Sequence, residues 1–211
     1  MARKAKQRSR ARGKTEASRR HIIDAALALA ARQGWAAVSL DAIAERAGVS
    51  LNDLLAEFRN KAAIVTGYFR DLDAAVLADG PADGDSVRDR LFDVLMRRFD
   101  RMAADKPALL SILRDSLADP CALVCALPRL ARSMALMLEA AGLPASGLWG
   151  PLRVKGLVLI YGNAMRVWVN EESTDLDKTM AALDRGLQQA ETIIRFLRAL
   201  PVPKQAGKSP T

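Results

Sequence analysis

The chain holds one histidine and two cysteines among 211 residues, too few for a convincing zinc site or a disulfide framework. No nucleophile and base stand in a recognisable catalytic pattern, so the sequence predicts no enzyme, no metal and no cofactor. No apolar run reaches about 18 residues, and no apolar segment follows the basic N-terminus, which excludes a membrane span and a secretory signal. We therefore expect a cytoplasmic protein.

Aromatic side chains are also scarce, at 5% of residues, although half of the chain is hydrophobic. Leu, Ala, Val, Ile and Met must therefore fill the core, and such a core suits helices better than sheets. Few stretches alternate apolar and polar residues, which argues against strands. The sequence predicts an all-α fold of about nine helices.

Positive charge is in excess, and it is concentrated at one end. The net charge is +8, and residues 1–20 hold nine basic side chains and one acidic one, which accounts for all of it. Such an arm can bind nucleic-acid phosphates whatever the base sequence, or it can be a solubilising tail. We expect residues 1–15 to be a disordered basic arm, and a helix to begin near residues 15–16.

Two short segments after this helix carry the most informative pattern. Ser39 is placed to cap a helix at Leu40–Ala47, and Ser50 to cap a second one at about Leu51–Phe58. The turn Gly48-Val49-Ser50 has the length that a helix-turn-helix uses. The spacing predicts a helix-turn-helix head whose second short helix can enter the major groove of double-stranded DNA.

Further along, a helix is predicted at about 61–77 and a linker rich in Gly, Pro and Asp at 79–85. We place the head at 16–78, a helical body at 85–200 and a disordered tail at 201–211. Pro128 is expected to kink or split the helix at 121–141, and Thr174 to cap the last helix. Apolar residues in that last helix step alternately by four and three, which predicts a seam for close helix packing.

The residues of the head resemble a known family. The stretch from Val38 to Ser50, followed by Leu54, Phe58, Lys61, Ala63 and Ile64, is similar to the DNA-binding signature of TetR-family transcriptional repressors. The resemblance covers about residues 20–70. It implies a homodimeric regulator that binds a near-palindromic operator and responds to a small, largely apolar ligand or lipid in its body.

The resemblance also implies site residues. Those expected to contact DNA are Arg19, Arg20, Ser39, Ser50, Leu51, Asn52, Asp53, Leu55 and Lys61. Those expected at the dimer interface are Val158, Leu176, Met180, Leu183, Leu187, Ala190 and Ile194. The large apolar residues that could line a ligand pocket, or simply fill the core, are Phe99, Met134, Met137, Tyr161, Met165 and Trp168.

The recognition helix differs from the usual TetR-family pattern, and a later segment resembles a second family. Leu55 stands where members usually carry an aromatic residue, and Asn52 where they carry a small one; the predicted recognition helix holds two acids and no base. Asn52 could read an adenine or be a solvated surface residue. Residues 165–191 are more weakly similar to ubiquinone-biosynthesis proteins of the Coq9 type, which leaves a lipid-binding accessory protein without an operator as the alternative.

Overall fold

The computed structural model describes residues 2–199, with side chains at 17–119 and 124–195; the predicted tail at 201–211 lies outside the described residues. Within this range the chain forms nine α-helices and no strand, which confirms the predicted all-α fold. None of these helices is long and apolar enough to cross a membrane. The helices are α1 (Ala2–Gln33), α2 (Leu40–Ala47), α3 (Leu51–Glu57), α4 (Lys61–Ala78), α5 (Val87–Ala103), α6 (Lys106–Leu117), α7 (Pro120–Ala140), α8 (Gly150–Asn170) and α9 (Asp177–Ala199).

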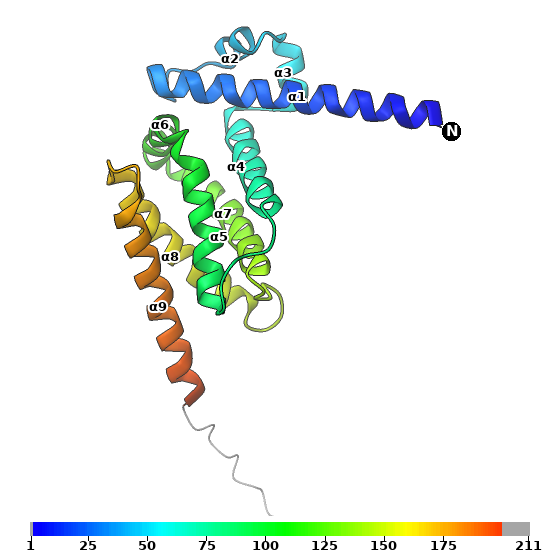
Figure 1. Ribbon diagram of the computed structural model, residues 1–211. Coiled ribbons are helices and arrows are strands. Elements are labelled where there is room, and N and C mark those ends of the chain that lie inside the picture. Colours follow the sequence, from blue (N-terminus) through cyan, green and yellow to red (C-terminus); the bar gives the residue numbers. More distant parts are fainter. Residues whose placement is uncertain (1, 200–211) are drawn as a thin grey trace, which may run out of the picture.

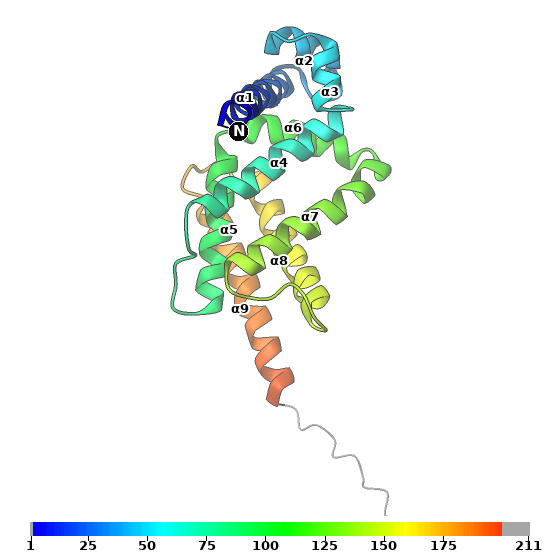
Figure 2. The same ribbon diagram turned by 90° about the vertical axis from the view of Figure 1, so that its right-hand side faces the viewer.

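The head, α1–α4, lies at one end of the bundle that α5–α9 form. In Figure 1 α1 lies across the end of the body, and α2 and α3 lie on its outer side. A view turned by 90° shows the same pair as the part of the molecule farthest from the C-terminal end of α9 (Figure 2). The helix-turn-helix is therefore presented outward, with the body behind it.

The first helix begins much earlier than the sequence predicted. Residues 2–15, expected to be a disordered arm, belong to α1, which starts at Ala2. Most residues at 2–14 are Ala, Arg, Lys and Gln, which are good helix formers, and they precede a segment whose apolar face is already fixed on the core. The basic charge of this region is therefore carried on a continuation of α1.

The helix that contains Pro128 is continuous. Of the two predicted outcomes, a kink or a split, the split is wrong, because α7 runs through Pro128 from Pro120 to Ala140, whereas the kink stays a prediction. Proline removes one N–H and leaves the carbonyl four residues earlier, that of Val124, without a helical partner. Residues 124–129 are exposed, so water can bind this carbonyl and the helix persists.

The last helix is capped by a different residue from the one predicted. Helix α9 begins at Asp177, beyond Thr174, and the cap is the buried carboxylate of Glu171. It accepts hydrogen bonds from the N–H of Lys178 at 2.7 Å, from the N–H of Thr179 at 3.0 Å and from the Thr179 hydroxyl. A cap that comes from six residues before the helix leaves no local pattern to recognise.

The carboxylate of Glu171 also makes stability depend on pH. Burial alone would raise its pKa, but the hydrogen bonds from Thr179 and Lys178 outweigh burial and lower the pKa. Because the folded-state pKa lies below the unfolded one, the carboxylate stabilises the fold above its ordinary pKa. This contribution is lost as the pH falls through the lowered value.

Replacing Glu171 with glutamine is therefore expected to cost about 1–2 kcal/mol of unfolding free energy at neutral pH, since one of the two acceptor oxygens is lost. The difference between the two proteins should shrink on acidification to pH 3, where the wild-type carboxyl is increasingly protonated. Urea titrations at pH 7 and at steps down to pH 3 measure both. A difference that stays constant over this range would contradict the role of the charge.

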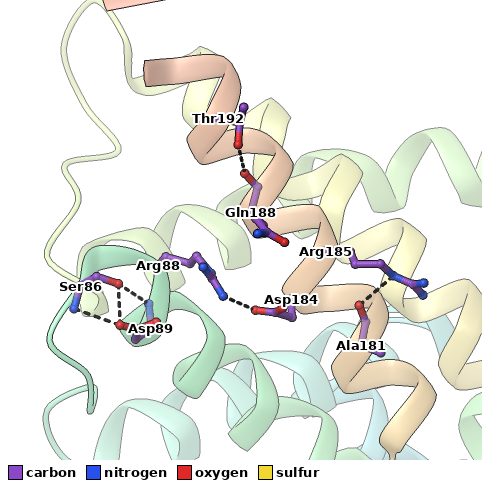
Figure 3. Close-up of polar contacts among 8 residues, drawn as sticks. All are labelled: Ser86, Arg88, Asp89, Ala181, Asp184, Arg185, Gln188 and Thr192. Carbon is purple, nitrogen blue, oxygen red and sulfur yellow. Dashed lines mark hydrogen bonds and ion pairs between the residues drawn. The ribbon is translucent and has the colours of Figure 1, made fainter. Parts of the chain in front are cut away.

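Polar contacts on the surface join α5 to α9 (Figure 3). Ser86 and Asp89 form a reciprocal capping box at the start of α5, with bonds of 3.1 and 3.2 Å. Arg88, which lies between these two residues in the first turn of α5, donates to Asp184 on α9 at 2.7 Å. This ion pair fixes the side of α9 that faces α5.

The seam of α9 is buried within the chain from Leu176 to Leu187, along the N-terminal half of the helix. Leu176, Leu183 and Leu187 are all less than 5% exposed because α9 packs on α8 and α5. These residues have no surface left for a partner, so their predicted place in a dimer interface is wrong. An alternating four–three pattern predicts which face of a helix is buried, but it does not say whether the same chain covers it.

Candidate nucleic-acid interface

The turn between α2 and α3 forms as the sequence predicted. Gly48 adopts a left-handed conformation, with φ 67°, and its N–H bonds back to the carbonyls of Ala44 and Glu45. Ser50 then caps α3, because its hydroxyl accepts the N–H of Asp53 at 3.1 Å. These local contacts end one short helix and start the next within three residues, which sets the angle between them.

The inner face of α3 is held on the core of the head. Leu54 and Phe58 are almost fully buried, together with Ile43 of α2 and Ile22 of α1. Helices of seven or eight residues are not stable alone, so this burial keeps α2 and α3 folded. A side-chain carbon at Gly67 of α4 would lie 2.8 Å from the Phe58 ring, so α4 can approach Phe58 only with glycine there.

The outer face of α3 is exposed and mixed in character. Leu51 and Leu55 are 38% and 40% exposed, and they stand one helical turn apart beside exposed Asn52 and Asp53. An apolar pair of this kind matches the methyl group that thymine presents in the major groove, while the amide of Asn52 matches adenine. The structure thus leaves four of the predicted contact residues open on one short helix.

Arg19 has a role within the fold. Its guanidinium lies 4.5 Å from the centre of the Phe58 ring and 3.9 Å from the carboxylate of Asp71 on α4, and its side chain is 17% exposed. Its charge is thus held between an aromatic face and an acid of the same chain. The predicted phosphate contact at Arg19 does not fit this packing, whereas Arg20 beside it is exposed.

Lys61 is also engaged by its own chain. Its ammonium donates to the carbonyl of Trp35 at 2.6 Å and lies 4.6 Å from the centre of the Trp35 ring. Burial lowers the pKa of Lys61, and the nearby charge of Asp115 partly offsets this. Lys61, which was predicted to bind a DNA phosphate, instead connects the start of α4 to the turn after α1.

The two capping serines differ in what they leave for DNA. Ser50 accepts from the backbone and donates its own O–H to the Asp53 carboxylate at 2.7 Å, so its donor is already used. Ser39 accepts the N–H of Ala42 at 3.1 Å and remains exposed, so its O–H can still reach a phosphate. Ser50 is therefore a structural cap only, whereas Ser39 is a cap that can also bind DNA.

Two exposed bases near the interface were not predicted as contacts. Arg46 lies in the last turn of α2, and Arg59 follows the C-terminal end of α3. Arg59 could have been predicted from the sequence, because it lies two residues after α3, a helix that has two acidic residues and no basic one. With Arg20, these side chains supply positive charge around a helix that has none.

The six predicted pocket residues come together in the body. Phe99, Met134, Met137, Tyr161 and Trp168 are at most 2% exposed, and Met165 packs against the same cluster. Phe99 stacks on Tyr161 with ring centres 5.1 Å apart and lies 6.2 Å from Trp168. In this structure they form packed core, so a pocket at this place stays a prediction.

Comparison with known proteins places these features in context. Residues 22–67 match the model of the bacterial regulatory proteins of the tetR family. The fold is similar to a TetR transcriptional regulator from Nitrosomonas europaea (26% identity, 82% of this chain, 98% of that chain, TM-score 0.68). It is also similar to a TetR regulator from Rhodococcus sp. RHA1 (19% identity, 83% and 96%, TM-score 0.64).

A third similar structure is FadR of Thermus thermophilus, a TetR-family repressor in complex with lauroyl-CoA (18% identity, 90% of this chain, 100% of that chain, TM-score 0.53). No curated protein sequence matches significantly. The weaker similarity of residues 165–191 to ubiquinone-biosynthesis proteins is not tested by these comparisons and stays a prediction.

Proposed function

We propose that this chain, which carries the DNA-binding domain of the TetR family on the fold of its regulators, is a dimeric transcriptional repressor of the cytoplasm. The observation that carries the proposal is the outward-facing, doubly capped helix-turn-helix, whose second helix exposes Leu51, Asn52 and Leu55. Helix α3 enters the major groove of an operator half-site, and exposed bases around it bind phosphates.

Phosphate binding rests mainly on charge outside α3. Helix α3 has two acids and no base, whereas residues 1–20 hold the whole net charge of +8. Acids beside phosphates oppose binding, so the basic continuation of α1 supplies the electrostatic part of the affinity, and α3 supplies the sequence preference.

A binding selection from random DNA tests the proposal directly. The full-length protein should recover a near-palindromic site, and gel shifts at stated salt should show much tighter binding to it than to scrambled DNA. Recovery of no common sequence, with equal affinity for all duplexes, would refute the proposed function.

Within the recovered site, replacing Asn52 with alanine is expected to relax the preference at one base pair of each half-site. The loss corresponds to about 1–3 kcal/mol, the usual value of a bidentate base contact. A matched control is Ser146→Ala in the exposed loop between α7 and α8, which should leave both affinity and preference unchanged. A uniform loss for all sequences would contradict base reading by Asn52.

The outer face of α8 supports the dimeric state. Leu152, Gly156 and Leu159 follow one face of the helix; Leu152 and Leu159 are strongly exposed, and a side chain at Gly156 would point into open space. Nothing within the chain therefore requires a glycine there, whereas the close approach of a second helix does.

The adjacent face of α9 extends this surface. Gly186 of α9 packs on Ile160 of α8, and Gln189 and Ile193 follow on the same side, with Ile193 60% exposed. The C-terminal half of α9 extends past the other helices (Figure 1). We assign the dimer interface to this α8–α9 face, a four-helix packing across the two-fold axis. Of the residues first predicted, Ile194 is half exposed, and Val158, Met180 and Ala190 are half buried.

The body is the proposed ligand-binding part. Its core is rich in methionine and aromatic side chains, which suit an apolar ligand. The FadR structure holds lauroyl-CoA, a ligand with a long apolar chain. Binding of a small apolar ligand here would favour a head position that no longer fits the operator.

A further inference from the structure

The core of the body contains a buried ion pair. Arg98 on α5 donates to Asp73 on α4, and these residues are 2% and 7% exposed. The same guanidinium donates through Nε to the Tyr161 hydroxyl on α8 at 3.1 Å, and Ser133 on α7 donates to Asp73 at 2.8 Å. Four helices thus meet at one charged group, and one of them, α4, belongs to the head.

The surroundings of this group are easily repacked. Six of the seven methionines of the chain lie in the core of the body: Met96, Met102, Met134 and Met137 are buried in it, and Met165 and Met180 pack against it. Methionine is unbranched and flexible, and it adapts to irregular shapes better than other apolar side chains. The cavity at the junction with the head, near Trp35 and Tyr68, has only about 10 Å³. That cavity lies in the core of the head and is lined by no methionine, so a ligand in the methionine-rich core would need space made by moving methionine side chains.

A second donor in the same core has no partner. The indole N–H of Trp168 is buried without a hydrogen bond within the protein, which is unfavourable. Trp168 adjoins Phe99, and Phe99 stacks on Tyr161, the residue to which Arg98 donates. Arg98 and the indole N–H of Trp168 can only donate hydrogen bonds, so a group that takes the place of Asp73 on Arg98, or that satisfies Trp168, must be an acceptor such as a carboxylate.

We propose that the body binds a carboxylate with an apolar body, whose carboxyl group replaces Asp73 on Arg98. The proposal rests on the proposed function, of which it names the ligand class. A guanidinium holds a carboxylate through paired hydrogen bonds, and the apolar part lies among the methionines. Because Asp73 belongs to α4, the exchange releases α4 from α5, and this release couples the ligand to the position of the head.

The competition between ligand and Asp73 gives the proposal a sharp test. Octanoate and 4-phenylbutyrate are the probes, and 1-octanol and octylamine are controls of the same apolar size. Melting temperatures of the full-length protein are measured without DNA. Both carboxylates should raise the melting temperature of the wild type, by roughly 5 °C at a concentration about 100-fold above Kd. The alcohol and the amine should not.

Three variants complete the test. Asp73→Asn removes the competing charge but keeps an acceptor for Ser133, and it should bind the carboxylates at least about tenfold more tightly. The double variant Arg98→Met with Asp73→Asn leaves no buried charge at this place, and its melting temperature should not rise with either carboxylate. Arg88→Met, which breaks the surface pair with Asp184, should respond like the wild type.

Equal responses to octanoate and octanol would overturn the proposal, as would an undiminished response of the double variant. No response of either the wild type or Asp73→Asn to both carboxylates would also overturn it. Because no DNA is present, a failed operator selection leaves this result unaffected, and the two proposals fail independently.

Discussion

Replacing Leu159 with aspartate is expected to convert the dimer into monomers and to weaken operator binding by at least about 100-fold, because the two heads no longer bind together. Leu159 is 74% exposed in the single chain, so the change removes no intrachain packing. In the dimer it would place a charge on each side of the two-fold axis, without a partner and away from water. Light scattering after gel filtration and titration of the selected operator measure the two effects.

The control for this variant is Leu117→Asp at the end of α6, a leucine that is 58% exposed and lies on a different helix. It adds the same charge to the surface and should leave both mass and affinity unchanged. If Leu159→Asp stays dimeric, or if Leu117→Asp dissociates equally, the assigned α8–α9 interface is wrong.

The second large effect is expected at the buried ion pair. Arg98→Met alone leaves the carboxylate of Asp73 buried without its cation, and the free energy of unfolding should fall by about 3–5 kcal/mol. The double variant Arg98→Met with Asp73→Asn buries no charge, so it should lose much less than the sum of the two single changes. Urea denaturation of the wild type, the two single variants and the double variant measures the four unfolding free energies of this double-mutant cycle.

Additive losses in the cycle would mean that Arg98 and Asp73 act independently, contrary to the contact between them. A loss below about 1 kcal/mol for Arg98→Met would mean that water reaches Asp73 in the variant. In either case the pair could not hold α4 against the body.

The parts of this molecule that were predictable from the sequence depend on local contacts. Ser39, Gly48 and Ser50 define the ends of α2 and α3 through bonds to residues three or four positions away, so their pattern is visible in the chain. The exposed face of α3 follows from the same pattern, because burial of Leu54 fixes which side points outward.

What could not be predicted depends on contacts between distant residues. From the sequence alone Arg19 and Lys61 are indistinguishable from surface bases, because their contacts with Phe58 and Trp35 form only in the folded chain. Arg98 and Asp73 are 25 residues apart and look like ordinary helix charges. For the α9 seam, periodicity identified the buried face but could not tell intrachain packing from a partner.

Helix α6 is the feature that links head and body most directly. Ala108 and Ile112 of α6 belong to the hydrophobic core of the head, across the predicted linker. Ser111 accepts the N–H of Trp35 at 2.7 Å, and Asp115 accepts that of Ala36 at 2.5 Å. A chimera that joins this head to another regulator's body within residues 79–85 would leave that face of α1 uncovered. For modular engineering the exchangeable unit is therefore discontinuous in sequence, since a transplanted head must carry α6 with it.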